Sequence, residues 1–468
     1  MTTTTGSATY DPTSTATQLA AAYTSARQAT LTQQTDRAAA TSTALDKLGS
    51  ALADFTASLA ALSGKKSLLA NSAAFSDSSV GSATASPLAA AGSYAFFVER
   101  LATAHQVSYS GLADSTAAGS GTLSIGVGTG SPITIDLSAA NKDGDNMLSP
   151  KEIAAAINIA PGNNGKVIAS ILTVNGIARM VLSASSTGAA SAITLDTSAV
   201  TNSAVKTALD APANFKQMTP AQDAIVWLDA ADAASGGTKL QQASNTYTVV
   251  DGVTMNFTKA QAAGAAPITM TVASDAAGSV SNVQSFVDAY NKLQKLVASQ
   301  TDVGDPAKGF TAGAFANDAG VTSLKDHLAA SIRSSVNGAT LAKYGITASR
   351  DGVLSVNSTK LKSALAANPA GLDQVFGSAT VGAKSGVMGD LDKYVNVWNN
   401  SVNGQITVRK ASLSKQQTTL VDRQATLDTQ YNSAYKRYLA QFTALQALQG
   451  QMASTTTMFD AMFNNRNN

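Results

Sequence analysis

The pattern of apolar and polar positions is most regular between Ile406 and Met452. One row of residues recurs every seven positions: Ile406, Leu413, Leu420, Leu427 and Ala434. A second row follows it four positions later each time: Lys410, Gln417, Gln424, Tyr431, Tyr438, Leu445 and Met452. These are the d and a positions of a heptad repeat, and no Gly or Pro between Gly404 and Gly450 interrupts the long helix that they predict. Because the first a positions are polar, this is either an ordinary helix packed within its own chain or a rod that needs a partner.

The N-terminal stretch repeats this pattern. Apolar residues alternate at spacings of three and four until Ser63 and Gly64 end the predicted helix: Leu45, Leu48, Leu52, Phe55, Leu59 and Leu62. Residues 1–15 are rich in Thr and Ser and are predicted to be disordered, with helix from Thr17 onward. We expect the two terminal helices to pair with each other and with further helices. The predicted partner residues are Leu45, Leu52, Phe55, Leu59, Leu413, Leu420, Leu427, Tyr431, Tyr438 and Leu445.

Between the terminal helices, alternating apolar residues predict strands. The expected strands are 94–98, 122–127, 133–137, 167–174, 177–183, 193–195, 225–228, 247–250, 253–257 and 268–272. The dipeptides Asn175-Gly176 and Asp251-Gly252 are typical of hairpin turns, and a Pro-containing linker is expected at 210–220. Helices are expected at 149–160, 283–297, 321–336 and 358–367, with a short strand pair at 345–356 and a last helix that leads from Met388 into the C-terminal stretch.

This order predicts an α+β multidomain fold. It has long terminal coiled-coil helices, a helical-bundle domain and two nested β-rich domains inserted between them. Helices at opposite ends of a chain can pair only if the chain runs out and returns, so the later domains are nested inside the earlier ones. The predicted domains are 1–42 with 405–468, 43–75 with 276–404, 76–118 with 212–275, and 119–211.

Composition narrows the class of function. The formal net charge is +2, only 13% of residues are charged, and no basic run occurs, so we expect neither nucleic-acid binding nor attraction to acidic lipid. The absence of Cys excludes disulfides, thiolate metal sites and thiol catalysis. No run of about 18 apolar residues is present, so no membrane insertion is expected. The first residues lack the basic and apolar regions of a cleaved signal peptide, so export would need another route.

One loop has the spacing of a calcium site. Asn141, Asp143, Asp145 and Glu152 fall at positions 1, 3, 5 and 12 of an EF-hand loop, with the Met147 carbonyl and Ser149 at positions 7 and 9. Three features depart from the pattern, because Asn141 at position 1 removes a charge, position 6 is Asn146 instead of Gly, and a strand precedes the loop instead of a helix. The alternative is a capping box, Ser149-Pro150-Lys151-Glu152, at the start of the next helix. Apart from calcium, no cofactor is expected.

No catalytic motif is present. The only histidines, His105 and His327, stand far apart in sequence and outside any recognised Ser or carboxylate motif. The Gly-rich stretch 119–130 lacks the Lys-Ser/Thr that closes a phosphate loop, and Trp227 and Trp398 are expected in a core or an interface. We therefore expect a protein that is not an enzyme.

Short matching stretches, in this order, resemble the family of the flagellar filament cap protein, hook-associated protein 2. They are 92–94, 98–102 with His105, 121–125, 153–158, 178–183 with 187–188, 286–291, 344–347, 351–356, 368–369, 375–376, 441–445 with Met452, and 458–459. The calcium-like loop looks like an insertion relative to the family pattern.

The resemblance implies a non-enzymatic, secreted cap at the distal tip of the bacterial flagellar filament. It implies a ring of copies of the chain, a pentamer, under which flagellin subunits fold. Its implied partners are flagellin, the hook–filament junction proteins and a cytoplasmic export chaperone that holds the C-terminal helix. Two alternatives remain open: another flagellar axial protein, such as a junction protein or a flagellin-like subunit, and a calcium-dependent secreted adhesin.

Overall fold

The chain divides into two compact units, and we describe each by itself. The computed structural model describes residues 11–174 and 177–464. One unit comprises Met1–Leu68 with Val280–Asn468, and the other comprises Leu69–Ser279. The middle of the chain is thus an excursion between two segments that share a unit, as the positions of the predicted terminal helices require. The predicted multidomain α+β class is confirmed, whereas the four predicted domain boundaries stay a prediction.

Helix α1 (Pro12–Gly64) begins before the expected position. The Asp11 carboxylate accepts hydrogen bonds from the backbone N–H groups of Thr13 at 3.1 Å and Ser14 at 3.0 Å, and Pro12 occupies the first helical position. An Asp N-cap followed by Pro is a strong start signal, because it satisfies free N–H groups and presets φ. The expectation of disorder was therefore wrong for residues 11–15, and residues 1–10 lie outside the described residues.

Helix α9 (Gln405–Asn464) continues beyond the expected end at Gly450. A single Gly in a helix interior costs about 1 kcal/mol relative to Ala, which is too little to end a helix of 60 residues. At its other end, α9 is separated from α8 (Gly386–Asn399) by a turn, so the continuous passage expected from Met388 was wrong. The Asn400 side chain accepts a hydrogen bond from the N–H of Val402 at 2.9 Å and fixes this turn.

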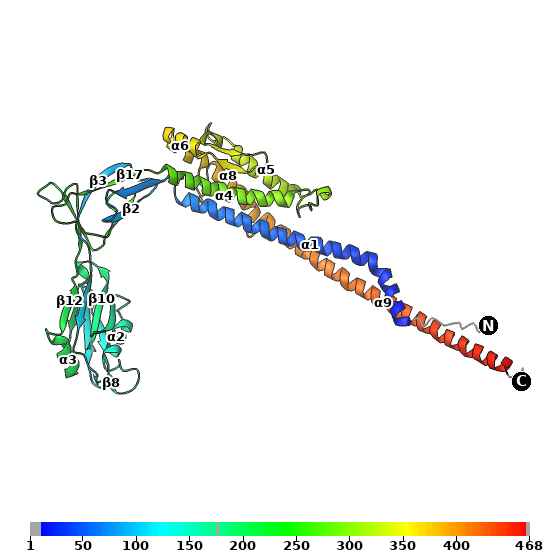
Figure 1. Cartoon of the computed structure of the whole chain (residues 1–468), viewed down its shortest axis with the longest axis horizontal. Coiled ribbons are helices and arrows are strands. Elements are labelled where there is room, and N and C mark those ends of the chain that lie inside the picture. The colour runs from blue at the N-terminus through cyan, green and yellow to red at the C-terminus, as the bar shows by residue number, and fades with distance from the viewer. Residues whose placement is uncertain (1–10, 175–176, 465–468) are drawn as a thin grey trace. The chain divides into compact units, whose positions relative to one another are not determined.

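Helices α1 and α9 run side by side, and α9 extends past the start of α1 (Figure 1). They are antiparallel, because Asp46 meets Lys410 whereas Gln28 meets Gln424. The helices approach closely at Gly49, where an added Cβ would lie 3.4 Å from the Ile406 side chain.

The rest of this unit is a bundle whose core is aromatic. Its elements are α4 (Ala276–Thr301, which begins in the other unit), α5 (Ala319–Arg333), β18 (Ile346–Ala348), β19 (Leu354–Val356), α6 (Ser358–Ala367), α7 (Pro369–Phe376) and α8, with 3-10 turns at Pro306–Lys308 and Leu341–Tyr344. Phe286 of α4 meets Phe376 edge to face, with ring centroids 5.0 Å apart, and Phe55 of α1 meets Tyr290 at 6.4 Å. Such rings dominate core energetics through their large buried area.

Arg409 fixes the start of α9 against the bundle. Its guanidinium makes a two-pronged contact with the Asp318 carboxylate, in which the Nη2–Oδ1 distance is 3.0 Å. The guanidinium carbon also lies 5.1 Å from the ring centroid of buried Trp398. A side chain at Gly320 would meet the same guanidinium, so glycine there leaves Arg409 its present position.

The second unit is built from antiparallel strands. Its sheets have the orders β1-β17-β3-β13-β14, β12-β4-β10-β9, β11-β6-β7, β15-β16-β2 and β5-β8. The strands are β1 (Asn71–Phe75), β2 (Gly81–Ala85), β3 (Gly92–Arg100), β4 (Ala104–Tyr109), β5 (Ser115–Thr116), β6 (Thr122–Val127), β7 (Ile133–Asp136), β8 (Met147–Leu148), β9 (Val167–Val174), β10 (Ile177–Thr187), β11 (Ile193–Asp196), β12 (Phe215–Thr219), β13 (Ala224–Leu228), β14 (Thr238–Gln242), β15 (Thr246–Tyr247), β16 (Val253–Phe257) and β17 (Ile268–Ser274).

Two cores lie in this unit. One gathers Phe75, Phe96, Tyr247, Phe257 and other side chains of the five-stranded and β15-β16-β2 sheets. The other gathers side chains from β4, β6, β7, β9 and β10, with Ile153 and Ile157 of α2 (Pro150–Ile159). The expected strands are present except 247–250, where β15 includes only Tyr247 of the expected residues. The expected linker at 210–220 was also wrong, because it contains the edge strand β12. The turn dipeptide Asn175-Gly176 lies outside the described residues.

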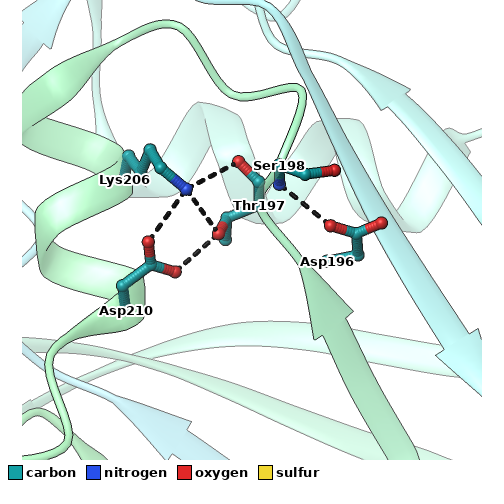
Figure 2. Close-up of polar contacts among 5 residues, drawn as sticks. All are labelled: Asp196, Thr197, Ser198, Lys206 and Asp210. Atoms are coloured by element: carbon teal, nitrogen blue, oxygen red, sulfur yellow. Dashed lines mark hydrogen bonds and ion pairs between the residues drawn. The ribbon is translucent and has the colours of Figure 1, made fainter.

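The helix α3 (Ser203–Asp210) was missed from the sequence, and a polar cluster ties it to the preceding strand end (Figure 2). The Lys206 ammonium lies 2.9 Å from the Asp210 carboxylate and donates to the carbonyl and hydroxyl oxygens of Thr197. The Thr197 hydroxyl and the Lys206 ammonium together lower the pKa of Asp210. In the same turn, Asp196 accepts a hydrogen bond from the Ser198 N–H at 2.9 Å.

Replacing Arg409 with Lys should destabilise the first unit by about 1–3 kcal/mol, because Lys keeps the charge but loses the bidentate contact and the stacking. The unfolding free energy in a denaturant titration measures this. Arg423→Lys is the matched control, since Arg423 is exposed and makes one hydrogen bond to Gln34 at 3.5 Å. Equal losses in the two variants would contradict the role given to Arg409.

Candidate assembly surfaces on the terminal helices

The d positions of α9 are buried inside the chain. Leu413, Leu420 and Leu427 are at most 7% exposed, and Ala434 is the last buried residue of this row. On the opposing helix, Leu31 and Ala38 continue the seven-residue spacing of Leu45 and Leu52, and both are buried as well. The pair is therefore an intramolecular coiled-coil contact, and its apolar seam ends near Ala434.

Polar a positions of α9 are used in contacts with α1. Lys410 lies 2.5 Å from the Asp46 carboxylate, and Gln424 exchanges hydrogen bonds of 3.1 Å with Gln28. The Lys410 pair is about half exposed, and exposed ion pairs contribute about 0–1 kcal/mol. These contacts therefore set the register of the two helices but add little to the stability of the helix pair.

Two grooves flank Leu427, where the α1 side of the seam thins to small residues. One has a volume of about 490 Å³ and is lined by Ala26, Arg27, Thr30, Leu31, Gln34, Arg423, Thr426, Leu427 and Gln430. The other has a volume of about 710 Å³ and is lined by Ala21, Thr24, Ser25, Gln28, Ala29, Thr32, Leu427, Asp428 and Tyr431. Ala and Thr are too small to fill the space beside the seam, so the two helices do not cover each other there.

Beyond half-buried Tyr438, the heptad rows are exposed throughout the described part of α9. Leu445, Leu448, Met452, Phe459 and Met462 fall on the same two rows and are 42–65% exposed. We call these five residues the overhang stripe. Between Leu439 and Met462 the only charged residue is Asp460. A helical face this apolar is typical of a surface that is covered by another chain.

The predicted partner residues separate into two groups. Leu45, Leu52, Phe55 and Leu59 are buried within the first unit, as are Leu413, Leu420 and Leu427. Tyr431 and Tyr438 are half-buried, and Leu445 is exposed. The role of all of them in contacts between chains stays a prediction. The sequence analysis missed Phe459 and Met462 because Gly450 was taken as the helix end, although the heptad count passes through both positions.

In the calcium-like loop, side-chain oxygen atoms accept hydrogen bonds from the backbone of the same loop. The Glu152 carboxylate accepts hydrogen bonds from the N–H groups of Ser149 and Lys142, both at 2.9 Å, and Ser149 caps α2. These backbone hydrogen bonds lower the pKa of Glu152. Asn141 accepts from the Gly144 N–H at 2.8 Å, and Asp145 accepts from the Met147 N–H at 2.7 Å. The capping box is therefore present.

Within residues 11–174 and 177–464, no group of three or more His or acidic side chains is arranged to hold a metal ion. A calcium site at Asn141, Asp143, Asp145 and Glu152 thus stays a prediction. Backbone conformation is compatible with the loop, because Asn146 adopts a φ of 63° at position 6.

Neither histidine belongs to a catalytic arrangement. The His327 Nε2 lies 3.5 Å from an Asp390 oxygen that also accepts a hydrogen bond from the Ser331 hydroxyl. The carboxylate stands between the hydroxyl and the imidazole, whereas a catalytic triad needs the imidazole in the middle. His105 is buried, and its Nδ1 accepts a hydrogen bond from the Ile193 N–H at 2.7 Å. Trp398 is buried in the bundle, and the Trp227 indole donates to the Glu99 carboxylate at 2.7 Å.

A structural protein, with paired terminal helices and β-rich domains inserted between them in the sequence, is the class that this architecture defines. In the part of the chain that the structure describes, no helix is long and apolar enough to cross a membrane. Residues 8–105 match the N-terminal family of flagellar hook-associated protein 2, and residues 221–454 match its C-terminal family. The chain belongs to the hook-associated protein 2 family, as its sequence motifs predicted.

Known proteins of this family match the sequence of this chain over most of its length. The lateral flagellar hook-associated protein 2 of Vibrio parahaemolyticus is 33% identical, over 83% of this chain and 85% of that protein. The B-type flagellar hook-associated protein 2 of Pseudomonas aeruginosa is 32% identical, over 88% and 86%. Among solved structures, the flagellar cap protein FliD from Escherichia coli is 26% identical, with a TM-score of 0.60, over 79% of this chain and 99% of that one.

Membership of this family makes the chain a secreted, structural component of the bacterial flagellum, at the filament tip. The predicted family, class and location are thus confirmed. The family is a structural one, and nothing in the comparisons indicates catalysis.

Glu152→Ala should lower the stability of the second unit by about 1 kcal/mol, since it removes half of the capping box. The expected loss is the same with and without millimolar calcium, and thermal unfolding in both conditions measures it. Asp143→Asn is the matched control and should be neutral. A rise in the unfolding temperature with calcium that Asp143→Asn abolishes would instead establish the calcium site.

The second unit should lose stability below about pH 6.5, the ordinary pKa of His. Burial lowers the pKa of His105, so the folded state favours the neutral ring whose Nδ1 accepts the Ile193 N–H. The unfolded chain then binds a proton that the folded chain does not, and this contribution to stability is lost as the pH falls. Above pH 7.5 the difference in unfolding temperature between the natural chain and His105→Gln should be constant. As the pH falls from 6.5 to 5, the unfolding temperature of the natural chain should drop relative to that of His105→Gln. Parallel pH profiles would contradict this assignment.

Proposed function

We propose that this chain forms a ring of identical copies, a pentamer, that caps the growing flagellar filament and promotes the folding and insertion of flagellin beneath it. Support comes from the family, because a solved relative is described as a flagellar cap protein. The observation on this chain that carries the proposal is the overhang stripe, an apolar helical face that is exposed in the part of the chain that the structure describes.

The overhang stripe is the surface through which copies meet. It lies on the rows that α1 and α9 already use, so a neighbouring helix can extend the same packing. Its near absence of charge lets identical copies lie side by side without repulsion. The grooves beside Leu427 offer space for neighbouring helices along the same pair.

The remaining partners follow from this role. Flagellin and the hook–filament junction proteins meet the assembled ring, and an export chaperone covers the overhang stripe before secretion. Four domains divide the labour: 1–42 with 405–468 enter the filament, 43–75 with 276–404 form the bundle, and 76–118 with 212–275 and 119–211 form the outer plate.

Removing residues 445–468 should abolish ring formation and filament elongation while leaving the fold intact, because the last buried residue of α9 is Ala434. Light scattering after size exclusion gives the mass of the assembly, and rescue of a strain that lacks its own cap protein gives the activity. Leu445→Gln combined with Leu448→Gln and Met452→Gln should weaken assembly at least tenfold.

Val421→Gln is the matched control, since Val421 is 68% exposed on α9 but lies off the two heptad rows. It should assemble and elongate filaments like the natural chain. A truncated chain that still forms rings and supports filaments would overturn the proposal.

A further inference from the structure

The four-stranded sheet of the second unit has an open edge at β9. The Asn158 side chain pairs with both the N–H and the carbonyl of Ala169 at 2.8 Å, and Asn163 does the same for Val167. These groups therefore point away from β10, and by the alternation of an antiparallel ladder so do those of Ile171 and Thr173. In the described part of the chain, no hydrogen bond closes the edge at these two residues.

This edge lacks the usual protection against pairing. Strand β9 contains no charged residue and no Pro, and its register with β10 is continuous from Val167 to Val174. The opposite edge of the same sheet, β12, carries Lys216 and an irregular register between Gln217 and Thr219. Charges and bulges are the features that prevent strands from pairing between chains. Because β9 lacks these features, its edge is free to pair with a strand of another chain.

Apolar side chains surround the same edge on the outward face of the sheet. Ile168, Leu172 and Val174 of β9 are 55%, 48% and 39% exposed, and Ile177 of β10 is 53% exposed. The core face of the strand, by contrast, is buried at Val167 and Ala169. Exposed aliphatic residues next to unpaired backbone groups are typical of a surface that binds another strand.

The edge is complementary to a second copy of itself. A twofold axis at Leu172 places Ile171 opposite Thr173 of the other copy, so that the outward N–H and carbonyl groups of both are paired. Leu172 then faces its own counterpart, and no charged residue of β9 meets a like charge. Joining β9 to β12 of another copy would instead bring the charge of Lys216 to this uncharged strand.

We propose that two copies of this chain join through residues 170–174 of β9, which pair antiparallel about a twofold axis at Leu172. The contact stops where Asn158 occupies the backbone of Ala169. It buries far less than the roughly 1,600 Å² of a standard stable interface, so it is weak in free protein and gains strength where copies are gathered. A twofold contact is distinct from the head-to-tail contact that repeats around a ring. An experiment can therefore exclude this twofold contact without excluding the proposed cap.

The absence of Cys makes the geometry directly testable on the full chain. In the proposed register Leu172 and its counterpart form a non-hydrogen-bonded pair with Cα atoms about 4.5 Å apart, within the range of a disulfide. Leu172→Cys should therefore give a disulfide-linked dimer under oxidised glutathione, visible on a non-reducing gel. Adding Thr173→Pro should slow the cross-linking at least fivefold, because it removes an outward donor without touching the bonds to β10.

Ile168→Cys is the matched control, on the same strand and face but where Asn158 and Asn163 cover the edge. It should stay monomeric on the gel. Equal cross-linking of the two variants, or none from Leu172→Cys, would overturn the self-pairing. If Leu172→Cys gives no dimer while Leu172→Lys stops filament elongation, the edge holds an extended segment of another protein instead.

Discussion

The antiparallel contact between α1 and α9 is the constraint on which the first unit depends. It joins the two ends of the chain, so everything between Gly64 and Gln405 must leave and return. Such a long excursion is thermodynamically tolerable, because each doubling of a loop adds only about 0.6 kcal/mol of closure entropy. The bundle then reinforces the contact at the point where α9 begins, through Phe55 on one helix and Arg409 on the other.

The strength of this contact changes along its length. Near the bundle, Ile406 and leucines fill the seam, whereas near Leu427 small side chains leave grooves and polar pairs set the register. Past Tyr438 the same heptad rows are exposed in the part of the chain that the structure describes. A gradient of this kind suits a protein that folds as a single chain and completes its helical packing only with other chains, because the tightest packing lies where no partner is needed.

In the second unit, the main constraint is that backbone groups at the sheet edges need hydrogen-bond partners. Side chains close backbone edges locally: Asn158 and Asn163 occupy half of β9, and Glu152 completes the cap of α2. Where this local pairing stops, between Ile171 and Val174, the edge remains available. Both units thus have exposed apolar residues on a regular element: the C-terminal part of α9 in the first and the free edge of β9 in the second.

The sequence by itself determined the elements that are long and periodic. The heptad rows, the alternation in strands such as Thr122–Val127 and Val253–Phe257, and the capping box at Ser149 each depend on residues close in sequence. The family motifs determined the class of protein. Tertiary structure decided the rest, because burial depends on partners distant in sequence. It showed that Leu413 and Leu420 are used within the chain while Leu448 and Phe459 are not, although all four obey one repeat. It also decided that β12 and α3 form, since β12 pairs with β4, and Val205 and Leu209 of α3 are buried in a core with distant strands. Periodicity identifies which faces need covering, but only the folded chain shows which of them it covers itself.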